Sequence, residues 1–268
     1  MNGIALITGG GAGIGREMAA VLAAKGHGVV LVGRNAARLE ETAEAIRTQH
    51  GVKAWTFASD LGTPGAARSL YQRTREAGID VELLVNNAGV GVYGEHTQLD
   101  GAEVDSMLEL NVTALTDLCM LYGADMRTRG HGRILNIAST AAYQPTPYFA
   151  AYGASKAYVL NFSEALAMEM AEHGVTVTCL SPGPTDTAFF SALDAEGISN
   201  SHFTKRESPR AVGELAVATM MAGTLSKIVG KKNAFLAWTG RFATRKMVAR
   251  LARGMMRASP KRLPAPAH

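Results

Sequence analysis

Two side chains that could exchange a proton stand four positions apart, at Tyr152 and Lys156. They open a segment whose pattern predicts a long helix, and residues four apart share one face of a helix, about 5–6 Å from each other. A phenol has an ordinary pKa of about 10, too high for efficient proton transfer at neutral pH. An ammonium group beside it favours the phenolate. We therefore expect Lys156 to lower the pKa of Tyr152 and to make it a general acid and base.

Ser139 could bring a hydroxyl group to the same place, since it follows an apolar run at 134–138 that predicts a strand. Asn111 interrupts an apolar helical pattern, and a buried asparagine must find hydrogen-bond partners. Each feature alone is also typical of ordinary structure, such as a solvated helix start or a satisfied core asparagine. Their meaning depends on the elements that position them.

A glycine-rich turn follows the first predicted strand. Residues 4–7 are apolar, residues 8–15 read TGGGAGIG, and a helical pattern comes next. A strand, a glycine turn and a helix form the layout in which backbone N–H groups and a helix N-terminus receive a pyrophosphate. Glycine is needed where φ is positive or where a phosphate comes closer than a Cβ permits. The spacing of Gly9, Gly13 and Gly15 departs from the GxGxxG pattern.

The second predicted strand, residues 29–32, ends in Gly33 and Arg34. An acidic side chain here would accept a hydrogen bond from the ribose 2′-OH of NAD and would repel a 2′-phosphate. The guanidinium of Arg34 instead suits a phosphate, which it can bind through two hydrogen bonds. The sequence therefore favours NADP(H) over NAD(H); the alternative is that Arg34 only caps the turn.

Apolar strands alternate with helical patterns along the rest of the chain. The further predicted strands are 54–58, 81–85, 134–138, 175–180 and 234–238, and the predicted helices include 36–50, 64–77, 103–129, 152–173 and 211–225. This alternation is typical of a parallel sheet with helices on both faces. We predict one α/β domain, residues 1–268, with a doubly wound parallel sheet of about seven strands.

Composition narrows the class of protein. A chain of 268 residues with 19% charged residues can bury a large core and does not resemble a disordered segment. Cys119 and Cys179 stand in apolar runs without metal-ligand spacing, which predicts buried reduced thiols, no metal site and a cytoplasmic protein. We expect no signal peptide, and no apolar stretch reaches the roughly 18 residues of a membrane-spanning helix.

The positive charge gathers near the C-terminus. The net charge is +4, but residues 1–214 hold 16 basic and 23 acidic side chains, whereas eleven Lys and Arg and no acidic residue follow Glu214. Within 238–260, apolar residues recur at helical spacing with arginines on the flanking faces, which predicts a basic amphipathic helix. It could form a subunit interface, a flap over an apolar substrate pocket, or a contact with an anionic membrane surface. The two packing roles together are favoured, and nucleic-acid binding is not expected because no recognition motif accompanies the charge.

The periodicity weakens between residues 189 and 206, which predicts a lid over a substrate site. Substrate specificity is expected there, in the loop after Tyr93 and in the loop 143–149, since loops vary most. An apolar lid and tail together favour a bulky, lipophilic carbonyl or alcohol substrate.

Several motifs occur together in one order: TGGGAGIG at 8–15, Asp60, NNAG at 86–89, Asn111, Ser139, YGASK at 152–156 and PGPTDT at 182–187. Over about residues 1–225 the chain thereby resembles the short-chain dehydrogenase/reductase family. The resemblance implies a Rossmann-type sheet, an NAD(P)(H) cofactor and the interconversion of ketones and secondary alcohols.

The resemblance also implies a catalytic tetrad of Asn111, Ser139, Tyr152 and Lys156. Tyr152 would deliver a proton to the carbonyl oxygen as hydride arrives from the nicotinamide, and Ser139 would hydrogen-bond that oxygen. Lys156 would lower the pKa of Tyr152 and bind the nicotinamide ribose. Asn111 would hold a water that links Lys156 to solvent.

Cofactor-binding residues are implied along the same motifs: Thr8, Gly9, Gly11, Gly13, Ile14, Gly15, Arg34, Asp60, Leu61, Asn87, Ala88, Gly89, Tyr152, Lys156, Pro182, Gly183, Thr185 and Thr187. Asp60 would meet the adenine, Asn87 the adenosine ribose region, and Thr187 with its neighbours the nicotinamide end. Ala12 stands where many NADPH-dependent members carry a basic residue, so the preference for NADP(H) rests on Arg34.

The predicted function is an NADP(H)-dependent oxidoreductase that interconverts a ketone and a secondary alcohol, in a homodimer or homotetramer as is usual for the family. One alternative is an NAD-dependent alcohol dehydrogenase of the same family. Another is a dinucleotide-binding scaffold or sensor without turnover, since a fold does not fix a function. The complete tetrad argues against the scaffold.

Overall fold

A computed structural model describes residues 2–187 and 206–256. Its centre is a parallel seven-stranded sheet with the strand order β3-β2-β1-β4-β5-β6-β7. The strands are β1 (Asn2–Thr8), β2 (His27–Gly33), β3 (Ala54–Ala58), β4 (Val81–Asn86), β5 (Gly132–Ile137), β6 (Val175–Ser181) and β7 (Ser226–Ile228). The inner strands are nearly continuous apolar runs, as burial on both faces of a parallel sheet requires.

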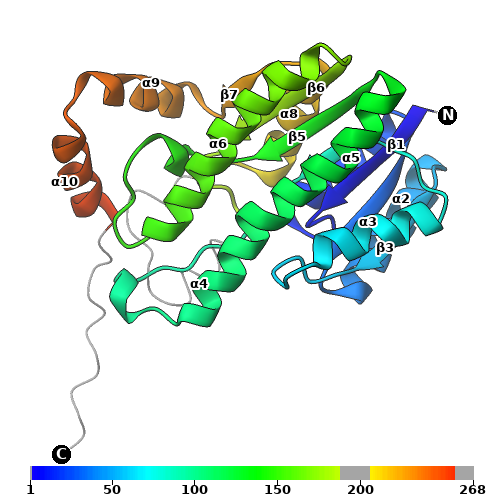
Figure 1. Cartoon of the computed structure of the whole chain (residues 1–268), viewed down its shortest axis with the longest axis horizontal. Coiled ribbons are helices and arrows are strands. Elements are labelled where there is room, and N and C mark those ends of the chain that lie inside the picture. Colours follow the sequence, from blue (N-terminus) through cyan, green and yellow to red (C-terminus); the bar gives the residue numbers. More distant parts are fainter. Residues whose placement is uncertain (1, 188–205, 257–268) are drawn as a thin grey trace, which may run out of the picture.

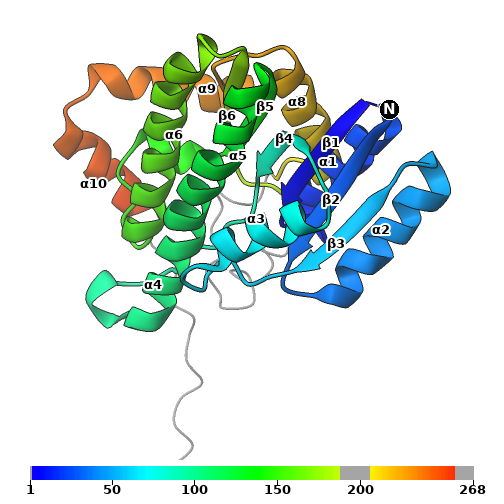
Figure 2. The same cartoon turned by 45° about the vertical axis from the view of Figure 1, so that its right-hand side comes forward.

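Helices cover both faces of the sheet (Figures 1 and 2). One face carries α3 (Ala66–Glu76), α5 (Leu115–Arg129) and α6 (Ala150–Ala171), and the other carries α1 (Gly13–Ala24), α2 (Ala36–His50) and α8 (Pro209–Met221). Because side chains alternate along a strand, Leu6 of β1 joins the first core while Ala5 and Ile7 join the second. The predicted doubly wound α/β fold is confirmed.

The strand order reverses between β1 and β4. The chain runs from β1 outward to β2 and β3, then returns to place β4 on the other side of β1. Loops that leave the carboxyl ends of β1 and β4 therefore diverge, and ligands of such sheets bind in the crevice between them. The strand order thus locates the candidate site before any side chain is considered.

Helix α2 shows how local sequence sets the boundaries of an element. The Asn35 side chain accepts a hydrogen bond from the Arg38 N–H at 3.0 Å, which caps the N-terminus. Gly51 ends the helix in the left-handed region, with φ of 65°. The observed bounds, Ala36–His50, are those that the sequence predicted.

The prediction of a strand at 234–238 is wrong. These residues lie in α9 (Lys231–Thr239), and the seventh strand is the three-residue edge strand β7. A short apolar run is consistent with either a strand or a helix, so periodicity does not decide between them. In the helix, Phe235 and Trp238 are 61% and 54% exposed and therefore belong to neither core.

The long helical pattern predicted at 103–129 is interrupted. The helix α4 (Gly101–Leu108) continues into a π-helix, Glu109–Ala114, which leads into α5. Such wide turns are frequent at functional sites. Asn111 lies on this π-helix.

The C-terminal extension consists of α9, a 3-10 turn at Gly240–Phe242 and α10 (Arg245–Met256). It lies at the end of the molecule far from β3, beside α6 (Figures 1 and 2). The helix expected within 238–260 is α10, and the lid expected at 189–206 lies outside the described residues except for Arg206. Among the described residues, no helix combines the length and the apolar character needed to cross a membrane.

Both cysteines are buried and free, Cys119 on α5 and Cys179 on β6. Burial raises the pKa of each thiol to about 12. The predicted burial of two reduced thiols is confirmed.

Candidate active site

Tyr152 and Lys156 lie one turn apart near the start of α6 and face the same space. The Lys156 Nζ lies 5.9 Å from the centre of the Tyr152 ring. Lys156 is only 5% exposed, and its ammonium donates a hydrogen bond to the Ile137 carbonyl at 3.0 Å. The bond ties α6 to the carboxyl end of β5, where Ser139 follows.

Burial controls the acidity of both groups. It raises the pKa of the Tyr152 phenol, and a hydrogen bond with the Ser139 side chain lowers that pKa in part. Burial also lowers the pKa of Lys156 to about 8. The sequence predicted a lowered pKa for Tyr152; in this structure burial raises it instead, and the hydrogen bond with Ser139 offsets the rise only in part. A phenol with a raised pKa is protonated at neutral pH and can act as a proton donor.

Ser139 is held from two sides. Its hydroxyl oxygen accepts a hydrogen bond from the Ala141 N–H at 3.1 Å and caps the 3-10 turn Thr140–Tyr143. The Thr140 N–H donates to the Pro182 carbonyl at 2.9 Å, which joins the loops after β5 and β6. These contacts hold the hydroxyl beside the Tyr152 phenol.

Asn111 links the loop after β4 to α6. Its Nδ2 donates to the Val90 carbonyl at 2.9 Å and to the Ser155 Oγ at 3.1 Å, and its Oδ1 accepts from the Val90 N–H at 3.1 Å. Ser155 in turn donates to the Tyr152 carbonyl at 2.7 Å. The π-helix thus directs a buried amide toward the helix that carries the phenol. The water expected at Asn111 stays a prediction.

Gly89 lies where these groups meet. A Cβ at this position would lie 3.1 Å from the Lys156 Nζ and 3.2 Å from the Asn111 Oδ1. The loop after β4 can approach both side chains this closely because the residue has no side chain. The π-helix, the end of β5 and the start of α6 thereby bring the four predicted catalytic residues to one edge of the sheet, around the loop after β4.

The glycine turn after β1 fits a pyrophosphate. Gly9 and Gly13 have positive φ of 70° and 53°, and a Cβ at Gly15 would collide with the Gly9 carbonyl. Helix α1 begins at Gly13 without a side-chain cap, and its first turn contains no acidic residue. Its first N–H groups are oriented toward the turn, where the helix dipole favours an anion.

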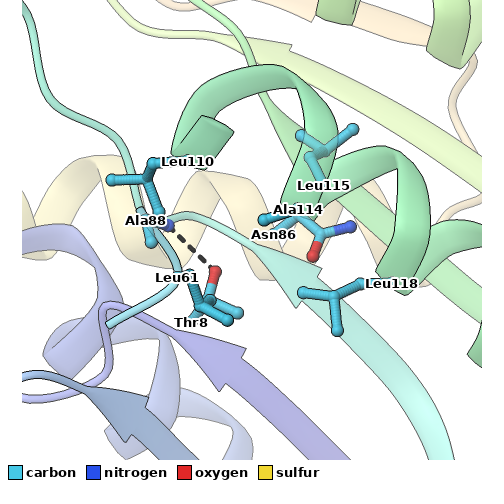
Figure 3. A pocket seen from close by; sticks show the side chains of 8 residues that line it. All are labelled: Thr8, Leu61, Asn86, Ala88, Leu110, Ala114, Leu115 and Leu118. Carbon is cyan, nitrogen blue, oxygen red and sulfur yellow. Dashed lines mark hydrogen bonds between the residues drawn. The ribbon is translucent and has the colours of Figure 1, made fainter. Parts of the chain in front are cut away.

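Thr8 connects this turn to the loop after β4. Its hydroxyl oxygen accepts hydrogen bonds from the Asn87 and Ala88 N–H groups, both at 2.9 Å, and the Asn87 side chain donates to the Thr8 carbonyl at 2.9 Å. Figure 3 shows the bond between Thr8 and Ala88 beside a cavity that is also lined by Leu61, Asn86 and side chains of the π-helix and α5. The cavity measures about 10 Å³, near the minimum for one water, so it is not a substrate pocket.

The remaining predicted cofactor residues follow other strands at the same edge. Arg34 is exposed after β2, and Asp60 is exposed after β3, where its carboxylate accepts a hydrogen bond from the Gly62 N–H at 3.1 Å. The segment after β6, which includes Pro182, Gly183 and Thr185, reaches back toward the glycine turn. A Cβ at Gly13 would lie 3.1 Å from the Thr187 Cγ2. Gly11 and Ile14 belong to the glycine turn and the start of α1.

An aromatic wall extends from Tyr152, and sequence reasoning missed its connection to the C-terminal helix. The Phe149 ring lies 5.5 Å from the Tyr152 ring and 5.0 Å from the Tyr93 ring, and the Tyr93 and Tyr148 rings are 5.9 Å apart. The Tyr93 hydroxyl donates to the Met256 carbonyl at the end of α10, at 2.8 Å. Tyr93 and the loop 143–149 were expected to affect specificity, but no sequence signal pairs them with α10.

The chain is similar in sequence and in structure to known proteins. A family model described as short chain dehydrogenase matches residues 3–197. Nodulation protein G of Rhizobium sp. (strain N33) is 32% identical over 230 residues, which are 85% of this chain and 92% of that protein. A short-chain dehydrogenase from Sphingobium yanoikuyae, solved in complex with NADPH, has a TM-score of 0.80 at 27% identity and covers 99% of both chains. The bulky-bulky ketone specific alcohol dehydrogenase from Comamonas testosteroni has a TM-score of 0.76 at 27% identity, over 90% of this chain and 92% of that one.

Proposed function

Because the chain belongs to the short-chain dehydrogenase family, whose members are oxidoreductases that act on CH–OH groups with an NAD(P) cofactor, we propose that it interconverts a bulky, lipophilic ketone and its secondary alcohol with NADP(H). The observation that carries the proposal is the meeting of Ser139, Tyr152 and Lys156 at the edge of the sheet where the glycine turn opens.

The bound dinucleotide would supply a hydride to the carbonyl carbon. The neutral Tyr152 phenol donates its proton to the carbonyl oxygen, and the Ser139 hydroxyl offers that oxygen a hydrogen bond as negative charge develops on it. The Lys156 ammonium then lies close enough to stabilise the phenolate that remains. Asn111 holds Ser155 and the backbone at Val90, so the active-site edge of α6 keeps its position.

The preference for NADP(H) is supported by charge at the end of β2. Arg34 is exposed there, and the first turn of α2 contains no acidic residue that would repel a 2′-phosphate. The similar structure from Sphingobium yanoikuyae contains NADPH.

The aromatic wall of Tyr93, Tyr148 and Phe149 supports the substrate class. Phe149 is 4% exposed and packs beneath Tyr152, whereas Tyr93 and Tyr148 are only partly buried and offer ring surface on which a flat or bulky apolar group can pack. The similar alcohol dehydrogenase from Comamonas testosteroni is described as specific for bulky-bulky ketones.

Replacing Tyr152 with Phe tests the proposal because the ring stays and only the hydroxyl is lost. We expect kcat/KM for carbonyl reduction to fall by about 10²–10⁴-fold, the usual contribution of a general acid. NADPH should still bind, as measured by fluorescence titration of the wild type and the variant.

The alternatives give different results in the same assays. Unchanged turnover by the Tyr152→Phe variant would refute the assigned role of the phenol. A wild-type protein that binds NADPH tightly but reduces no member of a broad carbonyl panel would favour the scaffold. Faster turnover with NADH than with NADPH would favour the NAD-dependent dehydrogenase.

A further inference from the structure

The C-terminal extension exposes large apolar side chains of a kind that folded proteins normally bury. On α9 and the turn after it, Phe235, Trp238 and Phe242 are 61%, 54% and 75% exposed, and on α10 Met247 and Leu251 are 61% and 69% exposed. The Trp238 ring lies 6.1 Å from Phe235 and 4.9 Å from Phe242, so the three rings form one cluster. We call these five residues the apolar patch. A cluster of exposed rings such as that of Phe235, Trp238 and Phe242 usually marks an interaction site, and Met247 and Leu251 add exposed apolar surface on α10.

Exposed cations border the apolar patch. Lys246, Arg250 and Arg253 recur at the spacing of one helical turn along α10, beside Met247 and Leu251. Lys231 and Lys232 are exposed at the start of α9. Within the part of the chain that the structure describes, none of these five cations forms an ion pair.

The inner face of α10 packs against the body of the protein. Ala252 is 3% exposed, Val248 and Met255 are partly buried, and the Met256 carbonyl accepts the hydrogen bond from Tyr93. The helix is therefore seated on the body through one face and presents Met247, Leu251 and the cations outward. A flap role in which α10 turns its outer residues into the substrate site would require it to leave these contacts.

The positive charge on the outer face of α10 favours a lipid surface over a second copy of this chain as the partner. In a two-fold dimer centred on this patch, the opposing surface is the same patch, which has no acidic residue to pair with its cations because none follows Glu214. Contact with the more acidic body of another copy would be head-to-tail, and such contacts form rings or open chains. An anionic lipid surface avoids both problems, because Lys and Arg are attracted to acidic headgroups while exposed aromatic and aliphatic side chains enter the interface.

We propose that the apolar patch and its cations dock this protein onto an anionic membrane surface. Tryptophan is favoured at the level of the headgroups, where Trp238 would lie. Through Tyr93 the inner face of α10 adjoins the aromatic wall beside Tyr152. Docking would therefore bring the edge that carries the candidate active site close to the lipid. The proposal concerns binding alone and does not depend on turnover.

Vesicle flotation with the full chain tests the proposal. We expect binding to vesicles of phosphatidylcholine and phosphatidylglycerol in equal parts, little binding to phosphatidylcholine alone, and a decline as salt is added. The triple variant Lys246→Gln, Arg250→Gln, Arg253→Gln and the double variant Trp238→Ser, Phe242→Ser should each bind at least about tenfold more weakly.

Matched controls separate the patch from net charge and from general apolar exposure. The triple variant Lys25→Gln, Lys53→Gln, Arg127→Gln removes as many exposed cations elsewhere, and Met168→Gln removes a side chain that is 62% exposed on α6. Both should bind like the wild type, with all variants shown to be folded by circular dichroism. Equal weakening by the two triple variants would overturn the proposal.

Tryptophan fluorescence gives a second readout, since the chain has 2 Trp. In a Trp55→Phe background, emission from Trp238 should shift to shorter wavelength with the acidic vesicles. An unshifted spectrum would contradict docking through this surface. So would a patch-dependent dimer in sedimentation experiments that leaves the vesicles unbound, which would assign the surface to a subunit interface.

Discussion

At the scale of single residues, Lys156 combines its proposed catalytic role with a cost in stability. Burial lowers its pKa to about 8 from the ordinary 10.5. Because the folded-state pKa is the lower one, protonation opposes folding. Below about pH 8 the lysine is protonated in both the folded and the unfolded state, and the cost of burying its charge lowers the free energy of unfolding in full. Between about pH 8 and 10.5 only the unfolded state binds the proton, so this cost disappears as the pH rises.

Replacing Lys156 with Met should therefore stabilise the protein at neutral pH, by on the order of 3 kcal/mol at most, and should abolish turnover. The difference in free energy of unfolding between variant and wild type should shrink as the pH is raised from 7 toward 10. Urea denaturation at several pH values measures it. A variant that is less stable than the wild type at every pH would show that the hydrogen bond to Ile137 outweighs the burial of charge.

Arg34 is the residue on which the proposed preference for NADP(H) rests. We expect Arg34→Ala to raise KM for NADPH by roughly 10–100-fold, the value of hydrogen bonds to a charged group, and to leave KM for NADH unchanged. Steady-state kinetics with both cofactors measures the effect. Lys25→Ala, an exposed cation at the end of α1, is the matched control and should change neither constant. An equal effect of Arg34→Ala on both cofactors would place the guanidinium away from the 2′ position.

At the scale of elements, the loop after β4 positions the site by its closeness to α6. Gly89→Ala would put a methyl group 3.1 Å from the Lys156 Nζ, and either the lysine or the loop would have to move by a few tenths of an ångström. We expect a loss in kcat/KM of up to about 10²-fold, since small displacements of catalytic groups are costly.

The matched control is Gly101→Ala at the start of α4, where a Cβ would meet nothing within 4 Å. It should retain full activity and lose no stability, because alanine favours a helix. A Gly89→Ala variant as active as this control would mean that the loop yields freely and does not position Lys156.

Which elements the sequence predicts depends on their length. The glycine turn is visible as a run of glycines and α2 as a fifteen-residue helical pattern, and both lie where they were expected. The strand β7 has three residues, too few to show a period, so the apolar run at 234–238 was taken for the last strand. The π-helix escapes prediction because its six residues, Glu109–Ala114, are too few to show a period of their own.

At the scale of the whole molecule, topology explains why the site could be anticipated. Ser139 follows β5 and Tyr152 lies on α6; only the 3-10 turn Thr140–Tyr143 and a short loop separate the strand from the helix at the carboxyl edge of the parallel sheet. Their approach follows from the fold class. The resulting pKa of Tyr152 does not, because it depends on how much water the packed site excludes. The homodimer or homotetramer and the cytoplasmic location stay predictions.

The contact between Tyr93 and Met256 joins the C-terminal helix to the active-site edge. We expect Tyr93→Phe to lose about 0.5–1.5 kcal/mol of stability, the usual value of one hydrogen bond, and to raise KM for a bulky ketone while the Kd for NADPH stays the same. Thermal unfolding and steady-state kinetics measure the two effects. Tyr158→Phe, which removes an exposed hydroxyl bonded to Thr116 on the outer side of α6, serves as the control and should leave KM unchanged. If both variants keep the wild-type KM, α10 does not shape the substrate site.

The burial of both thiols makes the chain suitable for site-specific labelling. Cys119 and Cys179 are its 2 cysteines, and with pKa values of about 12 they hold almost no thiolate at neutral pH. In the folded protein, a maleimide dye would therefore react with a single cysteine introduced on the surface and not with the two native thiols. No background substitution is needed before a fluorophore or spin probe is attached to α10.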